Sequence, residues 1–304
     1  MYDIIIIGAG PAGMTAAVYG QRAGKKTLLI DAKGFGGQIL NTSEVENYPG
    51  IKRISGFKLA SDLYEQASEL GAEIVYDKAV GIENSGGIRI VKTEGGSYQA
   101  KTVIIATGAK NRPLGIPSEE KFTGAGVSYC ATCDGAFFRG KAVAVIGGGN
   151  TALEDAEVLS GLASKVYLVH RRKELRGEQA GVKRLLAKDN VEFVLENVPV
   201  EILGENTVSG LKVRNVKTEE ENILTVQGVF VAIGQMPDNQ DFSDVAALDD
   251  RGYVAAGEDC LTGTPGVFTA GDCRTKKVRQ LATATADGAV AALAAVDYIN
   301  SMNA

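Results

Sequence analysis

Apolar residues along the chain form short runs separated by segments with helical spacing. Residues 3–7 are one such run, residues 12–24 have a helical pattern, and residues 26–30 form a second apolar run. The same order recurs over residues 142–172, with a helical pattern that extends to about Ser160. A strand, a turn, a helix and a second strand make a βαβ unit. We therefore predict an α/β fold that contains two such units.

Each unit has a glycine-rich turn between its first strand and its helix. A polar residue ends the second strand at the same distance from the first glycine in both copies, Asp31 in the first and His170 in the second. Such glycines let the backbone approach a pyrophosphate, whose charge then lies on N–H groups at the helix start. Two plain βαβ units with tight turns are the alternative, but the shared context favours two dinucleotide sites. The candidate residues are Gly8, Gly10, Pro11, Ala12 and Gly13 in the first turn, and Gly147, Gly149, Asn150, Thr151 and Ala152 in the second.

The two units differ at the residue that would contact the ribose. Asp31 is a carboxylate that accepts hydrogen bonds from ribose hydroxyls, which suits FAD or NAD. The second unit instead has His170, Arg171 and Arg172, with Arg176 close behind. Cations in this position suit a 2′-phosphate, and a solvated strand end is the weaker interpretation. The second unit is therefore predicted to bind NADPH.

The cysteine pair Cys130 and Cys133 lies between the two units, in a segment that reads as a loop running into a helix. Two cysteines three positions apart can close a disulfide, and a helix start favours the thiolate. Half of a zinc site and two inert core thiols are the alternatives. The chain has only two other cysteines, Cys260 and Cys273, and one histidine, so a four-ligand zinc site is disfavoured. We interpret the pair as a redox dithiol and expect no metal.

The remaining strand patterns indicate that one domain is inserted into the other. Three strands end at 103–108, 229–234 and 267–272, and an alanine-rich helix is predicted from about 280 to 299. The last strand and helix follow the second unit and are expected to complete the first domain. The fold class is thus two Rossmann-like domains, with a discontinuous FAD domain at 1–112 and 240–304 and an inserted NADPH domain at 113–239. The patterns within 72–101 and 191–226 are predicted to be antiparallel hairpins.

Length, charge and composition narrow the class of protein. A chain of 304 residues corresponds to about two domains. The net charge is −5 and there is no basic run, which argues against a nucleic-acid partner. No apolar run is long enough to span a bilayer, and no basic segment precedes the first strand. We therefore expect a cytoplasmic protein that does not bind membranes, in a compartment where a disulfide is more often catalytic than structural.

The motifs together resemble the low-molecular-weight, bacterial-type thioredoxin reductases, and the resemblance covers essentially all 304 residues. One departure is Gln235, where many members of that family have histidine. The resemblance implies FAD in the first domain, NADPH in the second, thioredoxin or a thioredoxin-like protein as partner, and a homodimer. It is carried by both glycine turns, Gly36-Gly37-Gln38, Glu46-Asn47-Tyr48-Pro49-Gly50, Cys130-Ala131-Thr132-Cys133-Asp134, His170-Arg171-Arg172, Gly271-Asp272 and Arg279-Gln280.

The resemblance also assigns roles to individual residues. It implies that Cys133 faces the flavin, that Cys130 attacks the partner's disulfide, and that Asp272 contacts the flavin side chain. Phe137 and Phe138 would belong either to the core or to the docking surface. The remaining FAD residues that it implies, beyond the first glycine turn and Asp31, are Gly37, Gln38, Asn47, Ala106, Thr107, Gly108, Gly271, Arg279, Gln280 and Leu281.

Chemistry adds three expectations to this picture. FAD is the logical relay because a flavin accepts a hydride and passes electrons to sulfur. Reduction of the cysteines also needs a proton, and Asp134 is the best donor because His170 lies at the nucleotide site; helix N-capping is its alternative role. Because the flavin must touch Cys133 while Cys130 must at another moment be open to a whole protein, we expect the domains to rotate about 110–113 and 235–239.

Four other functions compete with this interpretation. A peroxiredoxin-system flavoprotein would usually have an additional N-terminal thioredoxin-like region, and a ferredoxin-fed reductase would lack the NADPH features. A small-molecule dithiol oxidase would need an open pocket over the cysteines and would consume oxygen. A redox-sensing binding module would show no steady turnover of NADPH.

Overall fold

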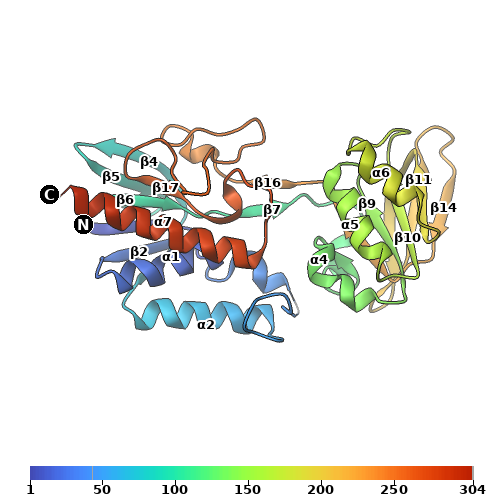
Figure 1. The fold of residues 1–304 in the computed structure, drawn as a ribbon, viewed down its shortest axis with the longest axis horizontal. Helices are drawn as coiled ribbons and strands as arrows, with labels where there is room; N and C mark the ends of the chain where they lie inside the picture. Colours follow the sequence, from blue (N-terminus) through green and yellow to red (C-terminus); the bar gives the residue numbers. More distant parts are fainter. Residues whose placement is uncertain (43, 303–304) are drawn as a thin grey trace. The chain divides into compact units, whose positions relative to one another are not determined.

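The computed structural model describes residues 1–42 and 44–302 and divides into two compact units (Figure 1). The first consists of Met1–Lys110 and the segment from Met236 onward, and the second of Asn111–Gln235. The predicted boundaries, at 112/113 and 239/240, are two and four residues later. The physical reason is that the crossings, β7 (Ala109–Asn111) and β16 (Gln235–Pro237), pair in a two-stranded sheet, and the division falls inside both strands.

The first unit is built on one seven-stranded sheet, with β1 next to β2 and β6. Strands β1, β2, β3, β6 and β17 pair in parallel, whereas β4, β5 and β6 form an antiparallel meander. Figure 1 shows helices α1 and α7 side by side on one face of this sheet. The bounds are β1 Tyr2–Ile7, β2 Thr27–Asp31, β3 Glu73–Tyr76, β4 Ala79–Ser85, β5 Ile88–Thr93, β6 Gly96–Ile105, β17 Val267–Thr269, α1 Pro11–Arg22, α2 Gly56–Glu69 and α7 Leu281–Ser301.

The apolar run at the start of the chain explains why this sheet is buried on both faces. Ile4 and Ile6 pack on one face with residues of α1 and α7, including Ala17 and Ala291. Ile5 and Ile7 pack on the other face with a second cluster that includes Val254. Because successive side chains of a strand point to opposite faces, a continuous apolar strand requires a cover on each side. The helical layer and the segment between β16 and β17 supply these two covers.

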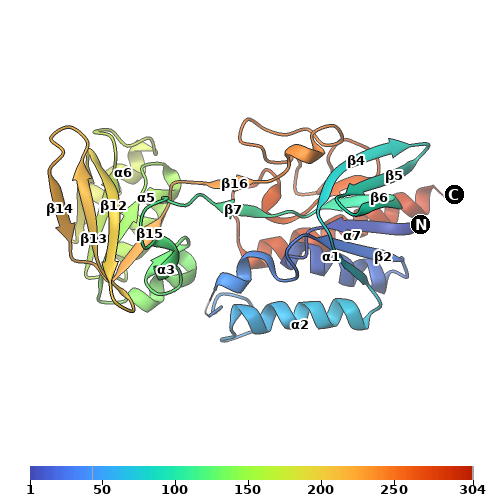
Figure 2. The same cartoon turned by 180° about the vertical axis from the view of Figure 1, so that it is seen from behind.

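The second unit repeats the plan with a smaller parallel sheet in the order β11-β10-β9-β15-β8. Figure 2 shows β12, β13 and β14, an antiparallel layer, beside this sheet. The bounds are β8 Val127–Ser128, β9 Ala142–Ile146, β10 Lys165–His170, β11 Val191–Leu195, β12 Asn197–Gly204, β13 Val208–Asn215, β14 Glu221–Leu224, β15 Gly228–Val231, α3 Glu119–Phe122, α4 Ala131–Asp134, α5 Asn150–Ser160 and α6 Gln179–Leu186. The predicted α/β class with two Rossmann-like domains is confirmed.

The hairpin prediction was wrong for the first strand in each of the two regions. Strand β3 pairs in parallel with β2, and β11 pairs in parallel with β10. Each follows a helix, α2 or α6, so it completes a second βα crossover instead of opening a hairpin. The later strands of both regions are antiparallel, as predicted. No helix among the described residues combines the length and apolar character needed to cross a membrane.

Candidate redox and nucleotide sites

The two cysteines of the predicted dithiol form a disulfide, with their Cα atoms 5.3 Å apart. Cys130 is extended and precedes the single turn of α4, which includes Cys133. The Cys130 N–H donates to Ser128 Oγ at 3.1 Å, and Cys130 Sγ lies 3.4 Å from Thr132 Oγ1. Both cysteines are half-buried. The pair is thus neither buried in a core nor split between separate elements.

Asp134 lies one helical turn after Cys130, whose carbonyl accepts its N–H at 3.1 Å. Ser128 Oγ donates to Asp134 Oδ2 at 2.6 Å. Burial raises the pKa of the Asp134 carboxyl above its usual range, and the hydrogen bond from Ser128 only partly opposes this. The side chain makes no helix-capping hydrogen bond, so the alternative role of N-cap is absent. The residue that directly follows Cys133 thus has a carboxyl that retains its proton more readily than usual.

Asp134→Asn is expected to lower the rate of disulfide reduction about 100-fold, because positioned general acids contribute about 10²–10⁴-fold. The wild-type rate should fall as the pH rises through the elevated pKa of Asp134, since only the protonated carboxyl donates. This fall should vanish in the variant. Steady-state turnover as a function of pH measures it, with the exposed Asp189→Asn in the same unit as control. Equal pH profiles for Asp134→Asn and wild type would contradict the role.

Asp155 is a second acid beside the redox turn that sequence reasoning missed. It lies on α5, and its carboxylate accepts a hydrogen bond from the Ala131 N–H at the start of α4. Burial raises the pKa of Asp155 to about 7. A signal was available, because Asp155 is at helical spacing with Ala152 and Leu159, which are buried. An acid on the apolar face of a helix is uncommon enough to be singled out.

The first glycine turn has the geometry that a bound pyrophosphate needs. Gly8 has φ +111°, and a Cβ there would lie 2.3 Å from the Ala106 carbonyl oxygen. At Gly10 a Cβ would meet nothing within 4 Å, so the backbone is open on that side. Helix α1 begins at Pro11 without an acidic residue in its first turn. The positive end of the helix is thus available to an anion.

Asp31 helps to shape this turn. Its Oδ2 accepts the Ala9 N–H at 2.7 Å, and its Oδ1 accepts the Lys33 N–H at 2.8 Å. An ionised carboxylate has about four acceptor positions, so both oxygens retain capacity for ribose hydroxyls. Gly37 also approaches the turn, because a Cβ on it would lie 3.2 Å from Gly10 Cα.

Several other residues expected to hold FAD are brought together at the carboxyl ends of the strands. Asn47 Nδ2 donates to Gln280 Oε1 at 3.3 Å, and Gln280 caps α7. Gln38 Nε2 donates to the Ala109 carbonyl at 2.6 Å. Asp272 Oδ1 is buried and has no hydrogen-bond partner among the described residues. Because a buried unpaired acceptor is costly, it is suited to a hydroxyl-bearing ligand, and the residues present fit FAD.

Asn239 is a buried residue of this region that the sequence analysis treated only as a domain boundary and as the end of the hinge segment 235–239. Thr107 Oγ1 donates to Asn239 Oδ1 at 2.6 Å. Asn239 Nδ2 donates to the carbonyls of Gly252 and Cys273, each at 2.9 Å. The amide therefore ties the β6 end to the turn that contains Asp272. These bonds place Asn239 in the first unit, whereas the predicted boundary assigned it to the second.

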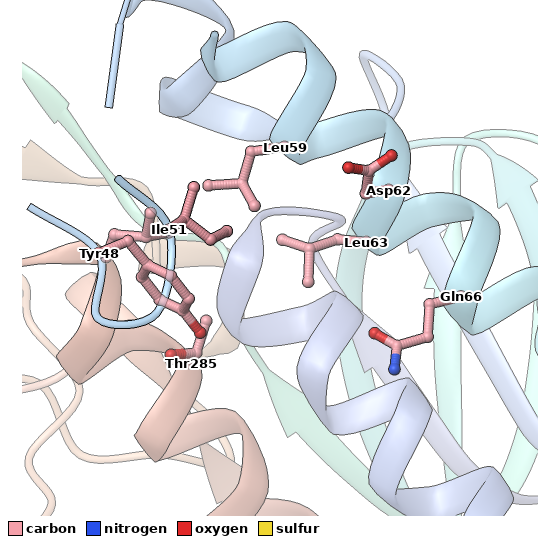
Figure 3. A pocket seen from close by; sticks show the side chains of 8 residues that line it. Tyr48, Ile51, Leu59, Asp62, Leu63, Gln66 and Thr285 are labelled. Carbon is pink, nitrogen blue, oxygen red and sulfur yellow. The ribbon is translucent and has the colours of Figure 1, made fainter. Parts of the chain in front are cut away.

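A pocket of about 240 Å³ lies between α2, the loop before it and the start of α7 (Figure 3). Leu59 and Leu63 line it from α2, Tyr48 and Ile51 from the loop, and Thr285 from α7. Leu281, an expected FAD residue, also lines it. Pockets that enclose whole cofactors are larger, about 300–1,000 Å³. This cavity therefore has room for a small group rather than for a dinucleotide.

The second glycine turn is held by the loop that follows β10. The N–H groups of Arg176 and Gly177 donate to the Gly148 carbonyl at 2.6 and 3.0 Å. A Cβ on Gly148 would lie 2.4 Å from the His170 ring, so the ring packs directly on the turn. His170 Nε2 is buried without a partner among the described residues. Burial, together with nearby arginines, lowers the pKa of His170, so the neutral ring is favoured.

The arginines predicted to bind a 2′-phosphate flank this turn. Arg171 and Arg172 directly follow β10 and are exposed, and Arg176 is exposed beside the turn. Helix α5 begins at Asn150 with no acidic residue in its first turn. An anion at this helix start would therefore meet backbone N–H groups and cations. The residues present fit NADPH.

The other two cysteines and the phenylalanine pair have structural surroundings. Cys260 and Cys273 are free and fully buried. Phe138 is buried and packs edge-on against Phe230, with ring centroids 5.1 Å apart. Phe137 is partly buried against the same cluster. Phe138 thus belongs to the core of the second unit.

Comparison with known proteins shows similarity to thioredoxin reductases along nearly the whole chain. Residues 2–288 match the pyridine nucleotide-disulphide oxidoreductase family. Thioredoxin reductase of Listeria monocytogenes is 42% identical over 303 residues, covering 99% of this chain and 95% of that protein. Thioredoxin reductase of Bacillus subtilis is 41% identical, covering 99% and 96%. The crystal structure of thioredoxin reductase from Streptococcus pyogenes is 44% identical, with a TM-score of 0.95 and 99% of each chain covered.

Proposed function

The chain belongs to the pyridine nucleotide-disulphide oxidoreductase family and, within it, to the thioredoxin reductases, and on this premise we propose that it carries electrons from NADPH through FAD and the Cys130–Cys133 disulfide to oxidised thioredoxin. The observation that carries the proposal is the half-buried disulfide, in the same unit as the second glycine turn. The unit Asn111–Gln235 thus combines the group to be reduced with the predicted NADPH site.

The chemistry balances with the groups available. FAD, when bound, accepts a hydride from NADPH and delivers two electrons to a disulfide. Reduction of Cys130–Cys133 breaks the S–S bond and consumes two electrons and two protons. The hydride carries one proton and two electrons, so one further proton is needed, and we assign its donation to Asp134, whose raised pKa favours the protonated form. Cys130 then attacks the thioredoxin disulfide and Cys133 resolves the mixed disulfide, which returns the pair to its oxidised form.

A direct experiment tests this function. The purified protein should be yellow and should reduce oxidised thioredoxin with NADPH much faster than with NADH. A colourless protein after reconstitution with FAD, or equal rates with both nucleotides, would contradict the proposal. The proposal includes a homodimer, as the family resemblance implies, and a location in the cytoplasm. Light scattering would measure the mass of the protein in solution. A mass equal to that of one chain would contradict the proposed dimer.

We also propose that the two units rotate relative to each other during turnover. Hydride transfer requires reacting atoms about 3–3.5 Å apart, and the disulfide must likewise reach the flavin. At another stage Cys130 must be open to a whole protein. Two arrangements, with hinges at 110–113 and 235–239, resolve these conflicting demands. A static enzyme, in which thioredoxin enters through a cleft, is the alternative.

A reversible tether between the units is expected to lower turnover at least about tenfold, because the rotation occurs in every cycle. A photocleavable crosslink avoids thiol chemistry and should be placed away from both glycine turns and from α4. NADPH-dependent reduction of thioredoxin is measured before and after cleavage. The control is the same crosslink placed within one unit. Full activity of the tethered enzyme would support the static alternative.

A further inference from the structure

A buried cluster of charges lies beneath the turn that contains Asp272. The side chain of Asp287, on α7, is 7% exposed, and those of Arg274 and Lys276 are 0% and 4% exposed. Arg274 binds both carboxylate oxygens, Nε to Oδ2 at 2.8 Å and Nη2 to Oδ1 at 2.9 Å. Lys276 Nζ donates to Oδ2 at 2.8 Å. Arg274 Nη2 also donates to Oε2 of Glu258, which is largely exposed, at 3.0 Å.

The same carboxylate also binds the backbone of the turn. The Gly271 N–H donates to Asp287 Oδ2 at 3.0 Å, one residue before Asp272. Gly271 has φ +81°, and a Cβ on it would lie 2.8 Å from the Ala12 Cβ. The residue after Asp287 is equally close to α1, because a Cβ on Gly288 would lie 2.2 Å from the Ala12 carbonyl oxygen. Asp287 is thus located where α7, the Asp272 turn and the first turn of α1 meet.

Stability alone is a weak reason for such a cluster. Well-packed apolar residues of similar volume often replace buried ion pairs without loss of stability. A buried charged network does, however, fix one arrangement of its members, because each hydrogen bond that is broken leaves an unpaired charge. Here the members that it fixes adjoin Asp272, whose Oδ1 is buried without a partner among the described residues.

We infer that Asp287 is a positioning residue of the flavin site: it anchors the Gly271 N–H and holds Arg274 and Lys276, so that Asp272 is presented to the flavin side chain in one orientation. The inference rests on the proposed function, in which FAD binds at this turn. Asp287 itself acts through the turn and through the two cations.

The charges around Asp272 provide a readout that packing alone would not give. Burial raises the pKa of Asp272; Lys276, Arg279 and Arg274 oppose this rise, and Asp287 adds to it. Tyr253 lies close enough to sense the Asp272 charge. A hydroxyl binds an ionised carboxylate more strongly than a protonated carboxyl, because the bond to the ion is charge-assisted, so FAD affinity should fall as the pH drops through the Asp272 pKa. Removing a cation should move this fall to higher pH, and removing Asp287 should move it to lower pH.

The test compares Asp287→Asn and Lys276→Met, with the exposed Asp297→Asn on the same helix as the matched control. Each apoprotein is titrated with FAD across the acid range, and the dissociation constant is followed by flavin fluorescence. Asp287→Asn should weaken FAD binding at least about tenfold at neutral pH, because it removes the carboxylate partner of buried Lys276 and leaves buried Arg274 paired with the exposed Glu258 alone. The midpoint is the pH at which half of the pH-dependent loss of FAD affinity has occurred. It should move to lower pH in Asp287→Asn, to higher pH in Lys276→Met and not at all in Asp297→Asn.

The outcomes separate this inference from the function on which it rests. If wild type and Asp297→Asn do not bind FAD, the proposed function fails. Suppose instead that wild type and Asp297→Asn bind FAD. The inference is then overturned, and the function stands, if Asp287→Asn and Lys276→Met both have the wild-type affinity and midpoint. The same holds if the midpoints of these two variants move in the same direction. Lys276→Met keeps the Arg274–Asp287 pair. It therefore carries the test if Asp287→Asn does not fold, and an unmoved midpoint would then overturn the inference.

Discussion

Cys133→Ser and Cys130→Ser are each expected to abolish NADPH-dependent reduction of thioredoxin, by about a thousandfold or more, but to fail at different steps. A disulfide needs both sulfurs, so neither variant can store the two electrons. Residues that act as one catalytic unit lose nearly the full effect when either is removed. The overall rate therefore cannot distinguish them, and the individual steps must be observed.

Spectra and trapping experiments distinguish the two cysteines. Cys130→Ser leaves the Cys133 thiolate, which is expected to give a long-wavelength charge-transfer band with oxidised FAD. Cys133→Ser leaves the Cys130 thiolate, which is expected to attack oxidised thioredoxin and remain as a mixed disulfide because no resolving thiol is present. Cys260→Ser is the control, since burial raises the pKa of Cys260 to about 12 and it has no disulfide partner. A band that appears only in Cys133→Ser would reverse the assigned order.

Replacing both Arg171 and Arg172 by serine is expected to weaken NADPH binding by about 2–4 kcal/mol, which is ~30- to 900-fold. Each hydrogen bond to a charged group contributes about 1.5–3 kcal/mol, and neighbouring contributions do not add fully. Both arginines directly follow β10 and are exposed, so their removal leaves the sheet intact. NADH lacks the 2′-phosphate and should bind almost as before.

The measurement is the Michaelis constant for each nucleotide, together with direct titration of NADP⁺ and NAD⁺. Lys173→Ser is the matched control, because it removes one exposed cation from the same loop without touching the predicted 2′-phosphate pair. A loss shared equally by NADPH and NADH would show that the arginines support the fold of the loop instead of recognising the phosphate.

Local sequence features predicted much of the fold because they act over short distances. The apolar run at 3–7 and the glycine turn after it specify a strand, a tight turn and a helix without help from distant residues. The repeat of this pattern at 142–172 identified the second domain in the same way. The Cys130–Cys133 disulfide was predictable because three-residue spacing in one helical turn brings the two Cα atoms close enough, 5.3 Å apart.

Strand partners were less predictable because pairing depends on contacts between distant segments. The sequence of 73–76 suits a parallel or an antiparallel strand equally well. Only the packing of α2 decides that β3 lies beside β2. In the same way, the packing of α6 decides that β11 lies beside β10. A hairpin and a βα crossover differ in where the chain returns, and local propensity does not encode this.

The sequence by itself determined the two nucleotide motifs, the redox pair and the order of the domains, since each is a short pattern whose chemistry lies in its own residues. Only the tertiary structure decided which distant polar groups surround them. Asp155 meets the redox turn, Asn239 ties Thr107 to the Asp272 turn, and Asp287 binds Gly271 across 16 positions of sequence. A buried polar side chain takes its role from the partner it finds, and that partner is selected by the packing of whole helices against the sheet.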